Sequence, residues 1–264
     1  MKLTINITSQ IINEACSVRK FAQGVASLVR DEHRVTIVHG DHETAKISLT
    51  QWRHDFEDLE AHNDCPAPGM LYDELLFALA AETRVLVSAL SEAGISSFGF
   101  SGSDGGICQL RKKYCAKNQG CFTVETCGID ARWIDIICGN RGVPVLSNVV
   151  HTPWREHYLI DSDLMAAAFA SGWPADALVY FVDGDGIPDL NGSVIRWLEV
   201  NDIELLEKQA VLNDDMHRKL VGCRVALKQG AARVRILPVS AVDNLAMLFF
   251  ARISSGTEVF VAAS

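Results

Sequence analysis

The chain has 264 residues, 48% of them apolar, and its 24 basic and 33 acidic side chains give a formal charge of 24 − 33 = −9. This composition excludes a disordered or low-complexity chain, and the negative charge argues against a nucleic-acid partner, which needs a basic surface. No apolar run approaches the roughly 20 residues that span a bilayer. The first ten residues turn polar too soon for a signal peptide. We therefore expect a cytoplasmic protein with no membrane partner.

Short apolar runs alternate with helical segments along the chain, which predicts an α/β fold with a mainly parallel sheet. The predicted strands are residues 3–7, 35–38, 95–100, 143–150, 178–182, 234–237 and 258–262. The predicted helices are residues 71–90, 163–171, 216–229 and 242–252. Residues 62–69 hold two prolines and a glycine and predict a loop, while residues 112–128 are compatible with a hairpin.

Near residue 174, the end of one predicted helix is followed closely by the start of a predicted strand. Gly172 and Pro174 end the predicted helix, and an apolar strand begins shortly afterwards at Leu178. We therefore expect two lobes, residues 1–174 and residues 175–264.

Three glycine-containing turns follow predicted strands, at residues 38–42, 100–106 and 182–186. Such turns bring backbone N–H groups close to phosphates, and the carboxyl ends of parallel strands are the usual place for ligands. Each turn alone is more often only a turn, and neither GxGxxG nor GxxxxGK[ST] occurs. His39 and His42 flank Asp41, but without a fourth ligand this is a weak signal, so no metal site is predicted.

Four stretches in order resemble the amino-acid kinase family, and within it the acetylglutamate kinases. They are TIVHGDHE at 36–43, ISSFGFSGSDGGICQLRKK at 95–113, DSDLMAAAFASGWPADALVYFVDGDGI at 161–187, and DDMHRKLVGCRVALKQGAARVRIL at 214–237 with Ser255-Gly256-Thr257 near the end. The resemblance implies a three-layer αβα sandwich. Its first lobe would hold the acceptor and the dimer contact, and its second lobe would bind the nucleotide.

The resemblance also implies a reaction and its partners: phosphoryl transfer from ATP, with Mg²⁺, to a carboxylate of a small-molecule acceptor, by a homodimer in arginine biosynthesis. Asp163 stands where the family has its organising aspartate, and Lys219 where it has the lysine on the nucleotide side. Both are the expected catalytic residues. The resemblance assigns nucleotide binding to Asp183, Gly186, Met216 and Lys219, and acceptor binding to Gly40.

Other positions depart from the family pattern. Asn6 occupies the place of a lysine at the end of the first strand, and Asp41-His42 replace glycines after Gly40. The arginine expected to bind the acceptor falls on Met70, the expected asparagine falls on Leu159, and a glycine pair is replaced by Asp214-Asp215. A transferring phosphoryl group needs cations and N–H dipoles, so these changes predict weak or absent phosphorylation of acetylglutamate.

Simpler interpretations remain open beside these. Asp163 is also interpretable as only the N-cap of the following helix, and Lys219 as only a solvated charge. Lys2 begins the first strand, so we do not expect it to replace the missing lysine. Two functions are compatible with the residues: a kinase of the acetylglutamate type with a weakened or altered acceptor site, or a non-catalytic dimeric module that binds nucleotide or regulates.

Overall fold

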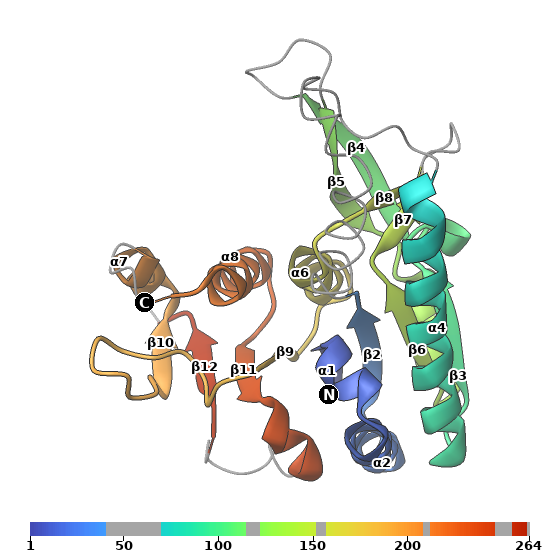
Figure 1. Ribbon diagram of the computed structural model, residues 1–264, viewed down its shortest axis with the longest axis horizontal. Helices are drawn as coiled ribbons and strands as arrows, with labels where there is room; N and C mark the ends of the chain where they lie inside the picture. The colour runs from blue at the N-terminus through green and yellow to red at the C-terminus, as the bar shows by residue number, and fades with distance from the viewer. Residues whose placement is uncertain (41–69, 115–121, 152–156, 208–211, 246–254, 263–264) are drawn as a thin grey trace.

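The computed structural model describes residues 1–40, 70–114, 122–151, 157–207, 212–245 and 255–262 (Figure 1). Its central element is an eight-stranded sheet with the strand order β10-β12-β11-β9-β1-β2-β6-β3. Neighbouring strands are parallel except for the β11–β12 pair, which is antiparallel. The predicted mainly parallel α/β fold is therefore confirmed.

The strands of the large sheet are β1 (Lys2–Ile7), β2 (Arg34–His39), β3 (Ser97–Ser101), β6 (Val143–Ser147), β9 (Ala177–Val182), β10 (Trp197–Glu199), β11 (Val234–Pro238) and β12 (Thr257–Phe260). Two antiparallel pairs stand apart from it, namely β4 (Cys108–Tyr114) with β5 (Phe122–Ile129) and β7 (Val149–His151) with β8 (His157–Leu159). The α-helices are α1 (Ser9–Asn13), α2 (Ala15–Arg30), α4 (Met70–Glu92), α5 (Arg132–Gly139), α6 (Ser162–Gly172), α7 (Ile203–Glu207) and α8 (Asp214–Lys228).

Helices cover both faces of the sheet and bury one apolar layer on each. Alternation along β1 explains why: Leu3, Ile5 and Ile7 pack with α2 and part of α4, while Thr4 and Asn6 point to the other face. On that other face α5, α6 and α8 contribute to a second core around Leu178. Figure 1 shows α6 and α8 on one side of the sheet and α2 on the other. The fold is thus a helix–sheet–helix sandwich.

The predicted elements agree with the structure best where apolar periodicity is strong. The helices predicted at 71–90, 163–171 and 216–229 correspond to α4, α6 and α8, and the run at 143–150 is divided between β6 and β7. Residues 112–128 belong to the β4–β5 hairpin, whose strands begin at Cys108 and end at Ile129.

Two predicted segments have a different outcome. The helix predicted at 242–252 begins as a 3-10 helix, η4 (Val239–Asn244), and the remainder from residue 246 lies outside the described residues. The loop predicted at 62–69 also lies outside the described residues. A second 3-10 helix, η2 (Asp104–Gly106), follows β3, and a third, η3 (Val200–Asp202), precedes α7.

None of the helices in the described ranges combines the length and apolar character that a membrane crossing needs. The large sheet runs without a break across residue 174, because β9 pairs with β1. Division into lobes at that residue stays a prediction, and so does a cytoplasmic location.

Candidate active site

The candidate site lies at the carboxyl edge of the sheet, where β1, β2 and β9 end side by side. Asn6 pairs with Val38 on one side and with Tyr180 on the other. Gly40 follows β2 directly, and Asp183 follows β9. Parallel strands that end together leave their loops at one edge, which is the usual ligand position in open α/β sheets.

Asp163 is a buried residue of the site and not a helix cap. Asp161 is the N-cap of α6, because its Oδ1 accepts from the backbone N–H groups of Asp163 (3.0 Å) and Leu164 (3.1 Å). The interpretation of Asp163 as the N-cap is therefore wrong. With the cap supplied by Asp161, the Asp163 side chain is free to turn inward, where only 3% of the residue is exposed.

Lys219 on α8 contacts Asp163 across the helix pair. Its Nζ lies 3.2 Å and 3.3 Å from the two carboxylate oxygens of Asp163, and 3.0 Å from Oδ1 of Asp215 one turn earlier. The residue is 5% exposed, so the interpretation as a solvated charge is also wrong. Asp215, one of the two aspartates at the position of the expected glycine pair, shares the lysine with Asp163.

The α6–α8 contact that joins these residues depends on Gly222. Tyr180 Oη donates to the backbone carbonyl of Asp163 at 2.7 Å, and a Cβ at Gly222 would collide with that hydroxyl. A helix-interior glycine costs stability, so its presence here is explained by the close approach of α8 to β9. This approach places Lys219 against Asp163.

The site holds more negative than positive charge. Burial raises the pKa of the Asp163 carboxyl to about 6, although the Lys219 charge lowers it. Burial lowers the pKa of Lys219, but the carboxylates of Asp163 and Asp215 raise it further, so it lies above its ordinary value. The pKa of Asp163 is therefore raised chiefly by burial, and that of Lys219 by the two carboxylates that share its ammonium.

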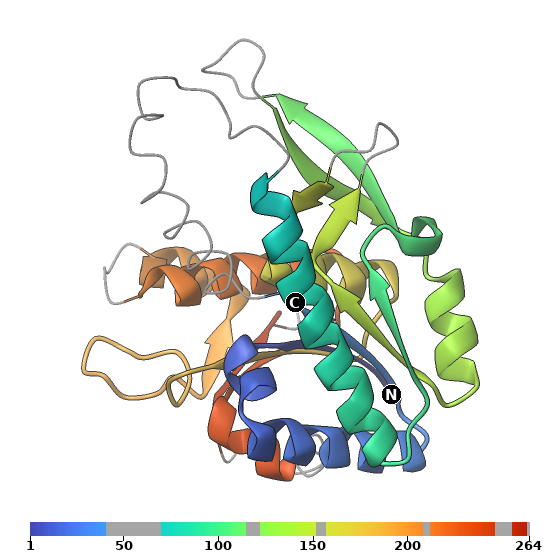
Figure 2. The ribbon, with the colours of Figure 1, turned by 45° about the vertical axis from the view of Figure 1, so that its right-hand side comes forward.

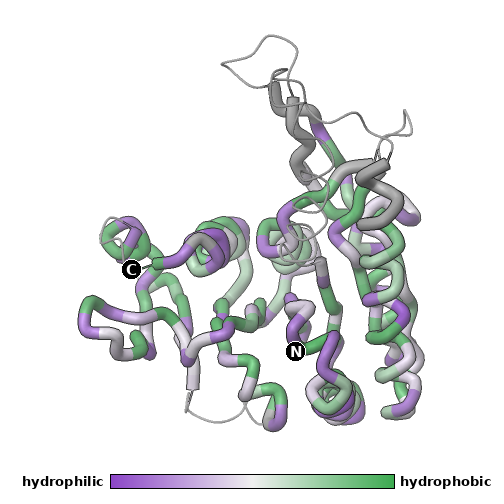
Figure 3. Tube along the Cα trace, in the orientation of Figure 1, coloured by the Kyte–Doolittle hydropathy of each residue, from purple (hydrophilic) through white to green (hydrophobic). Residues whose placement is uncertain are grey.

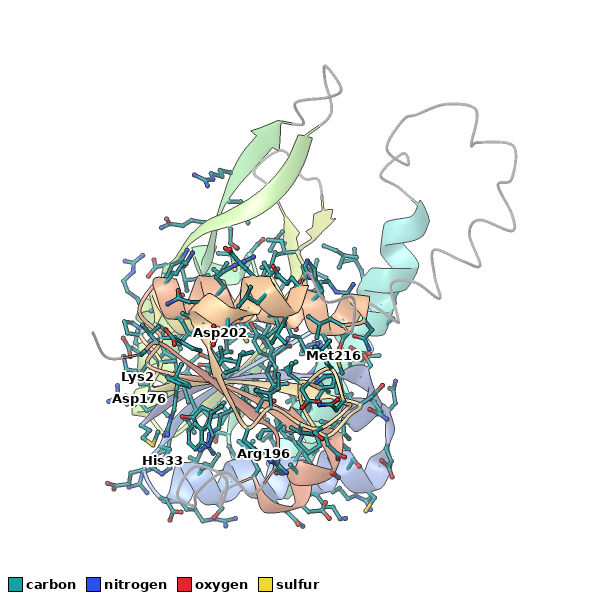
Figure 4. The ribbon with its side chains drawn as sticks, turned by 90° about the vertical axis from the view of Figure 1, so that its left-hand side faces the viewer. Lys2, His33, Asp176, Arg196, Asp202 and Met216 are labelled. Carbon is teal, nitrogen blue, oxygen red and sulfur yellow. The ribbon has the colours of Figure 1, made fainter. Side chains whose placement is uncertain are left out.

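Asn6 lies at the end of β1, at the position where the resemblance to the family predicts a lysine. Its Nδ2 donates to Asp163 Oδ1 at 2.7 Å, and the residue is 5% exposed. Lys2 does not replace the missing cation. Its Nζ lies 3.5 Å from Asp135 and 5.0 Å from the ring centroid of Trp173 at the amino end of β1. Figure 4 shows Lys2 beside Asp176 at one end of the strands, while Met216 lies at the other end.

The residues expected to bind nucleotide come together around the turn after β9. The Met216 side chain lies next to Gly184, and Gly186, with φ +140°, packs against Gly256 and Thr257. Thr257 Oγ1 accepts from the backbone N–H of Ile187 at 2.9 Å. Asp183 and Gly186 thus lie on a turn that a second glycine-containing segment supports.

Gly40 is packed against Asn148, which follows β6. A Cβ at Gly40 would collide with the Asn148 amide, and its φ of +139° lies in the region that favours glycine. Two hydrogen bonds fix Asn148: its backbone N–H donates to the carbonyl of His39 (3.0 Å), and its side-chain Nδ2 donates to the carbonyl of Ile160 (2.7 Å). The acceptor-side turn therefore begins at a crowded, fixed position.

His39 belongs to a buried polar cluster behind Gly40, which the sequence did not predict. Its Nδ1 lies 3.4 Å from Glu82 Oε2, and its Nε2 lies 2.8 Å from Thr83 Oγ1, both on α4. Ser9 on α1 donates to Glu82 Oε1 at 2.6 Å. The cluster ties α1, β2 and α4 together. Asp41 and His42 lie outside the described residues.

The two acceptor-side positions that depart from the expected pattern lie on β8 and α4. Leu159 ends β8 and packs against the small apolar cluster of Leu79 and Val149. Met70 is the first residue of α4. The glycine turn after β3 is structural, because a Cβ at Gly102 would collide with Met165 of α6.

A parallel sheet with a buried aspartate–lysine pair and glycine turns at its carboxyl edge defines an α/β protein with a charged small-molecule site. The model of the amino acid kinase family matches residues 1–238. Acetylglutamate kinase from Acidobacterium capsulatum is 37% identical over 242 residues, which cover 91% of this chain and 92% of that protein. The same enzyme from Koribacter versatilis is 32% identical over 260 residues, 98% of each chain.

The chain belongs to the amino acid kinase family. Solved structures share its fold at lower identity. N-acetylglutamate synthase from Neisseria gonorrhoeae, complexed with coenzyme A and N-acetyl-glutamate, has a TM-score of 0.78 at 18% identity. The match covers 100% of this chain and 60% of the synthase chain, so this chain spans about three-fifths of its length. Giardia carbamate kinase has a TM-score of 0.66 at 12% identity, covering 99% of both chains.

Proposed function

We propose that the chain is an ATP-dependent carboxylate kinase of the acetylglutamate kinase type in which phosphoryl transfer is weakened. The acceptor would be a small acylated amino acid or a related carboxylate. One observation carries the proposal. Asp163 and Lys219 form a buried pair at the carboxyl edge of the sheet, and the third side chain in contact with this aspartate is the neutral amide of Asn6.

The reaction itself needs positioning more than proton transfer. A carboxylate is already ionised at neutral pH, so its oxygen attacks the γ-phosphorus directly while the bond to the ADP oxygen breaks. The barrier is the approach of two anions, which cations and N–H dipoles lower. In this chain Lys219 would supply the cation on the nucleotide side, and Asp163 would orient it.

The donor set also fits Mg²⁺ carried by the nucleotide. This ion usually binds through one or two carboxylates together with phosphate oxygens. Within the described ranges no group of three His, Cys, Asp or Glu side chains could hold a metal ion by itself. Two carboxylates, of Asp163 and Asp215, do lie together, because both contact Lys219 Nζ. When bound, Mg²⁺ would neutralise part of the phosphate charge.

A nucleotide-binding measurement tests the nucleotide side of the site, which is the side whose residues resemble the family. Mg²⁺-ATP and ADP are each expected to raise the melting temperature, because a ligand at about 100 times its dissociation constant adds about 2.7 kcal/mol to the free energy of unfolding. Lys219→Met should lose most of this shift, measured from its own baseline. Lys228→Met, at the exposed end of the same helix, should keep it.

If neither nucleotide shifts the melting temperature of the wild-type chain, the kinase proposal fails. The neutral Asn6 at the lysine's place, taken by itself, favours the alternative of a non-catalytic dimeric module. It predicts nucleotide shifts with no acceptor-dependent release of ADP.

We also infer a homodimer through α4 and β3. Phe98 (48% exposed) on the edge strand β3 lines a groove of about 570 Å³ between β3 and α4, and α4 also exposes Phe77 (75%) and Val85 (41%). Figures 2 and 3 show α4 lying along the outside of the molecule with hydrophobic and hydrophilic residues alternating along it. A second copy would cover both these side chains and the free strand edge.

Sedimentation velocity tests the dimer. Phe98→Glu is expected to convert it to a monomer, since a charge would be buried against the partner. Trp197→Glu changes a somewhat more exposed aromatic residue (58%) on β10, at the other end of the sheet, and should leave the dimer intact. A wild-type monomer, or dissociation by both variants alike, would contradict the inferred interface.

A further inference from the structure

Asp215 contacts two cations of α8 through one carboxylate oxygen. Its Oδ1 lies 3.0 Å from Nζ of Lys219 and 3.6 Å from Nη2 of Arg218, both about one turn later in the same helix. Asp215 also stands at one position of the expected glycine pair, so this chain has a negative charge where the resemblance predicts none. Two neighbouring cations that share one anionic oxygen are also how proteins hold an oxygen of a phosphate group.

Asp215 is the least anchored of the three carboxylates around these cations. Asp161 has its side chain 21% exposed, and its other oxygen caps α6 by accepting from two backbone N–H groups. The Asp163 side chain is 5% exposed and accepts from Asn6 as well as from Lys219. The Asp215 side chain is 48% exposed, and its ion pairs with described residues are those with the two cations. Exposed ion pairs between helix residues three and four apart are weak, so a ligand can displace this carboxylate.

The two cations lie beside the turn proposed for the nucleotide. The Met216 side chain, from the same first turns of α8, lies next to Gly184. Arg218 offers a planar guanidinium that is 25% exposed on its side chain, and this group suits two phosphate oxygens at once. Lys219 supplies a buried point charge next to it. The amino end of a helix also favours a negative ligand, so a phosphate here would meet both side-chain charges.

We propose that Arg218 and Lys219 form a phosphate-binding pair, which the Asp215 carboxylate occupies in the free protein. A phosphate group of the ligand replaces the carboxylate, and the Asp215 side chain then turns to solvent. The inference rests on the nucleotide side of the proposed function, to which it adds Arg218 as a second cation and Asp215 as an internal competitor. Because the carboxylate must first be displaced, phosphate binds more weakly than the two cations alone would allow.

Inorganic tripolyphosphate is the probe, titrated into the full-length chain by isothermal titration calorimetry. Mg²⁺ is left out, because a cation bound by the carboxylates would mask the charge of Asp215. Asp215→Asn is expected to bind the probe about tenfold more tightly than the wild type, because the competing charge is gone. Damage to the fold does not raise an affinity, so this gain separates a competing role of Asp215 from a structural one.

Two further variants test the cation and the specificity of the gain. Arg218→Gln should weaken tripolyphosphate binding about tenfold, because it removes a charge-assisted contact. Asp243→Asn is the matched control, since the Asp243 side chain is also 48% exposed and pairs with Lys20 at 2.8 Å, where η4 meets α2. It removes the same charge from the chain, but it should change the affinity by less than about twofold, because distant exposed charges are screened.

Several results would overturn the proposal. They are no tripolyphosphate binding by either the wild type or Asp215→Asn, no gain of affinity in Asp215→Asn, an equal gain in Asp243→Asn, and unchanged binding by Arg218→Gln. Binding detected only in Asp215→Asn would support it. Circular dichroism establishes that each variant is folded, and if Arg218→Gln is not, the gain in Asp215→Asn decides the result.

ADP, titrated in parallel, separates this result from the proposed function. Tripolyphosphate binding with no binding of ADP or ATP would contradict the kinase and leave the phosphate-binding pair. Nucleotide binding that neither Asp215→Asn nor Arg218→Gln changes would contradict the phosphate-binding pair and leave the kinase.

Discussion

Asn6→Lys is expected to increase the rate of phosphoryl transfer to acetylglutamate by about 10²–10³-fold, the usual effect of one preorganised charge donor. The new ammonium would enter a corner where Asp163 Oδ1 already accepts a hydrogen bond at 2.7 Å. There it would balance the charge of Asp163, whose present partner Lys219 is shared with Asp215. The measurement is the steady-state rate of acetylglutamate-dependent ADP release.

Asn6→Gln is the matched control for this gain. It lengthens the side chain but adds no charge, so its rate should stay at the wild-type level. If Asn6→Lys folds and binds ATP but gains no activity, the missing cation is not what limits the reaction. The changes at Met70 and Leu159 on the acceptor side would then be the main cause.

Lys219→Met is expected to lower the free energy of unfolding by about 3–5 kcal/mol. Removing one partner of a buried ion pair leaves the other charge without compensation, which costs more than the pair contributes. Here the charge left behind is Asp163, which is 3% exposed and would keep only the neutral amide of Asn6 as its side-chain partner. Urea denaturation at neutral pH measures the change.

Two further variants make this result specific. Lys228→Met removes an exposed lysine from the same helix and should change the free energy of unfolding by less than about 0.5 kcal/mol. Adding Asp163→Asn to Lys219→Met should recover most of the loss, because the buried charge is then removed as well. A loss below 1 kcal/mol for Lys219→Met would mean that the pair is solvated.

Apolar periodicity predicted most of the large sheet and the helices α4, α6 and α8. It also contains a signal for α2 that the prediction did not use. Val18, Phe21, Val25 and Val29 recur at helical spacing and are all buried against the sheet. Short elements carry too little apolar periodicity to be distinguished from loops. The helix α5 has about two turns, and the strand β10 has three residues.

The site was predictable only in part. The family resemblance identified Asp163 and Lys219, but local sequence could not distinguish an N-cap from a buried ligand residue. That distinction depends on Asp161 taking the cap. Contacts between residues 6, 163 and 219 join three distant segments, and the attraction of Lys219 to Asp215 appears only once α8 is placed. His39 gave no sign of its contact with Glu82 on α4.

The turnover number of the wild-type chain with saturating Mg²⁺-ATP and acetylglutamate tests the central claim most directly. Because Asn6 and not a lysine contacts Asp163 at the end of β1, while Lys219 remains on the nucleotide side, we predict a kcat below about 1 s⁻¹, under the usual range of 1–10³ s⁻¹. A kcat within that range, abolished by Lys219→Met, would contradict the account.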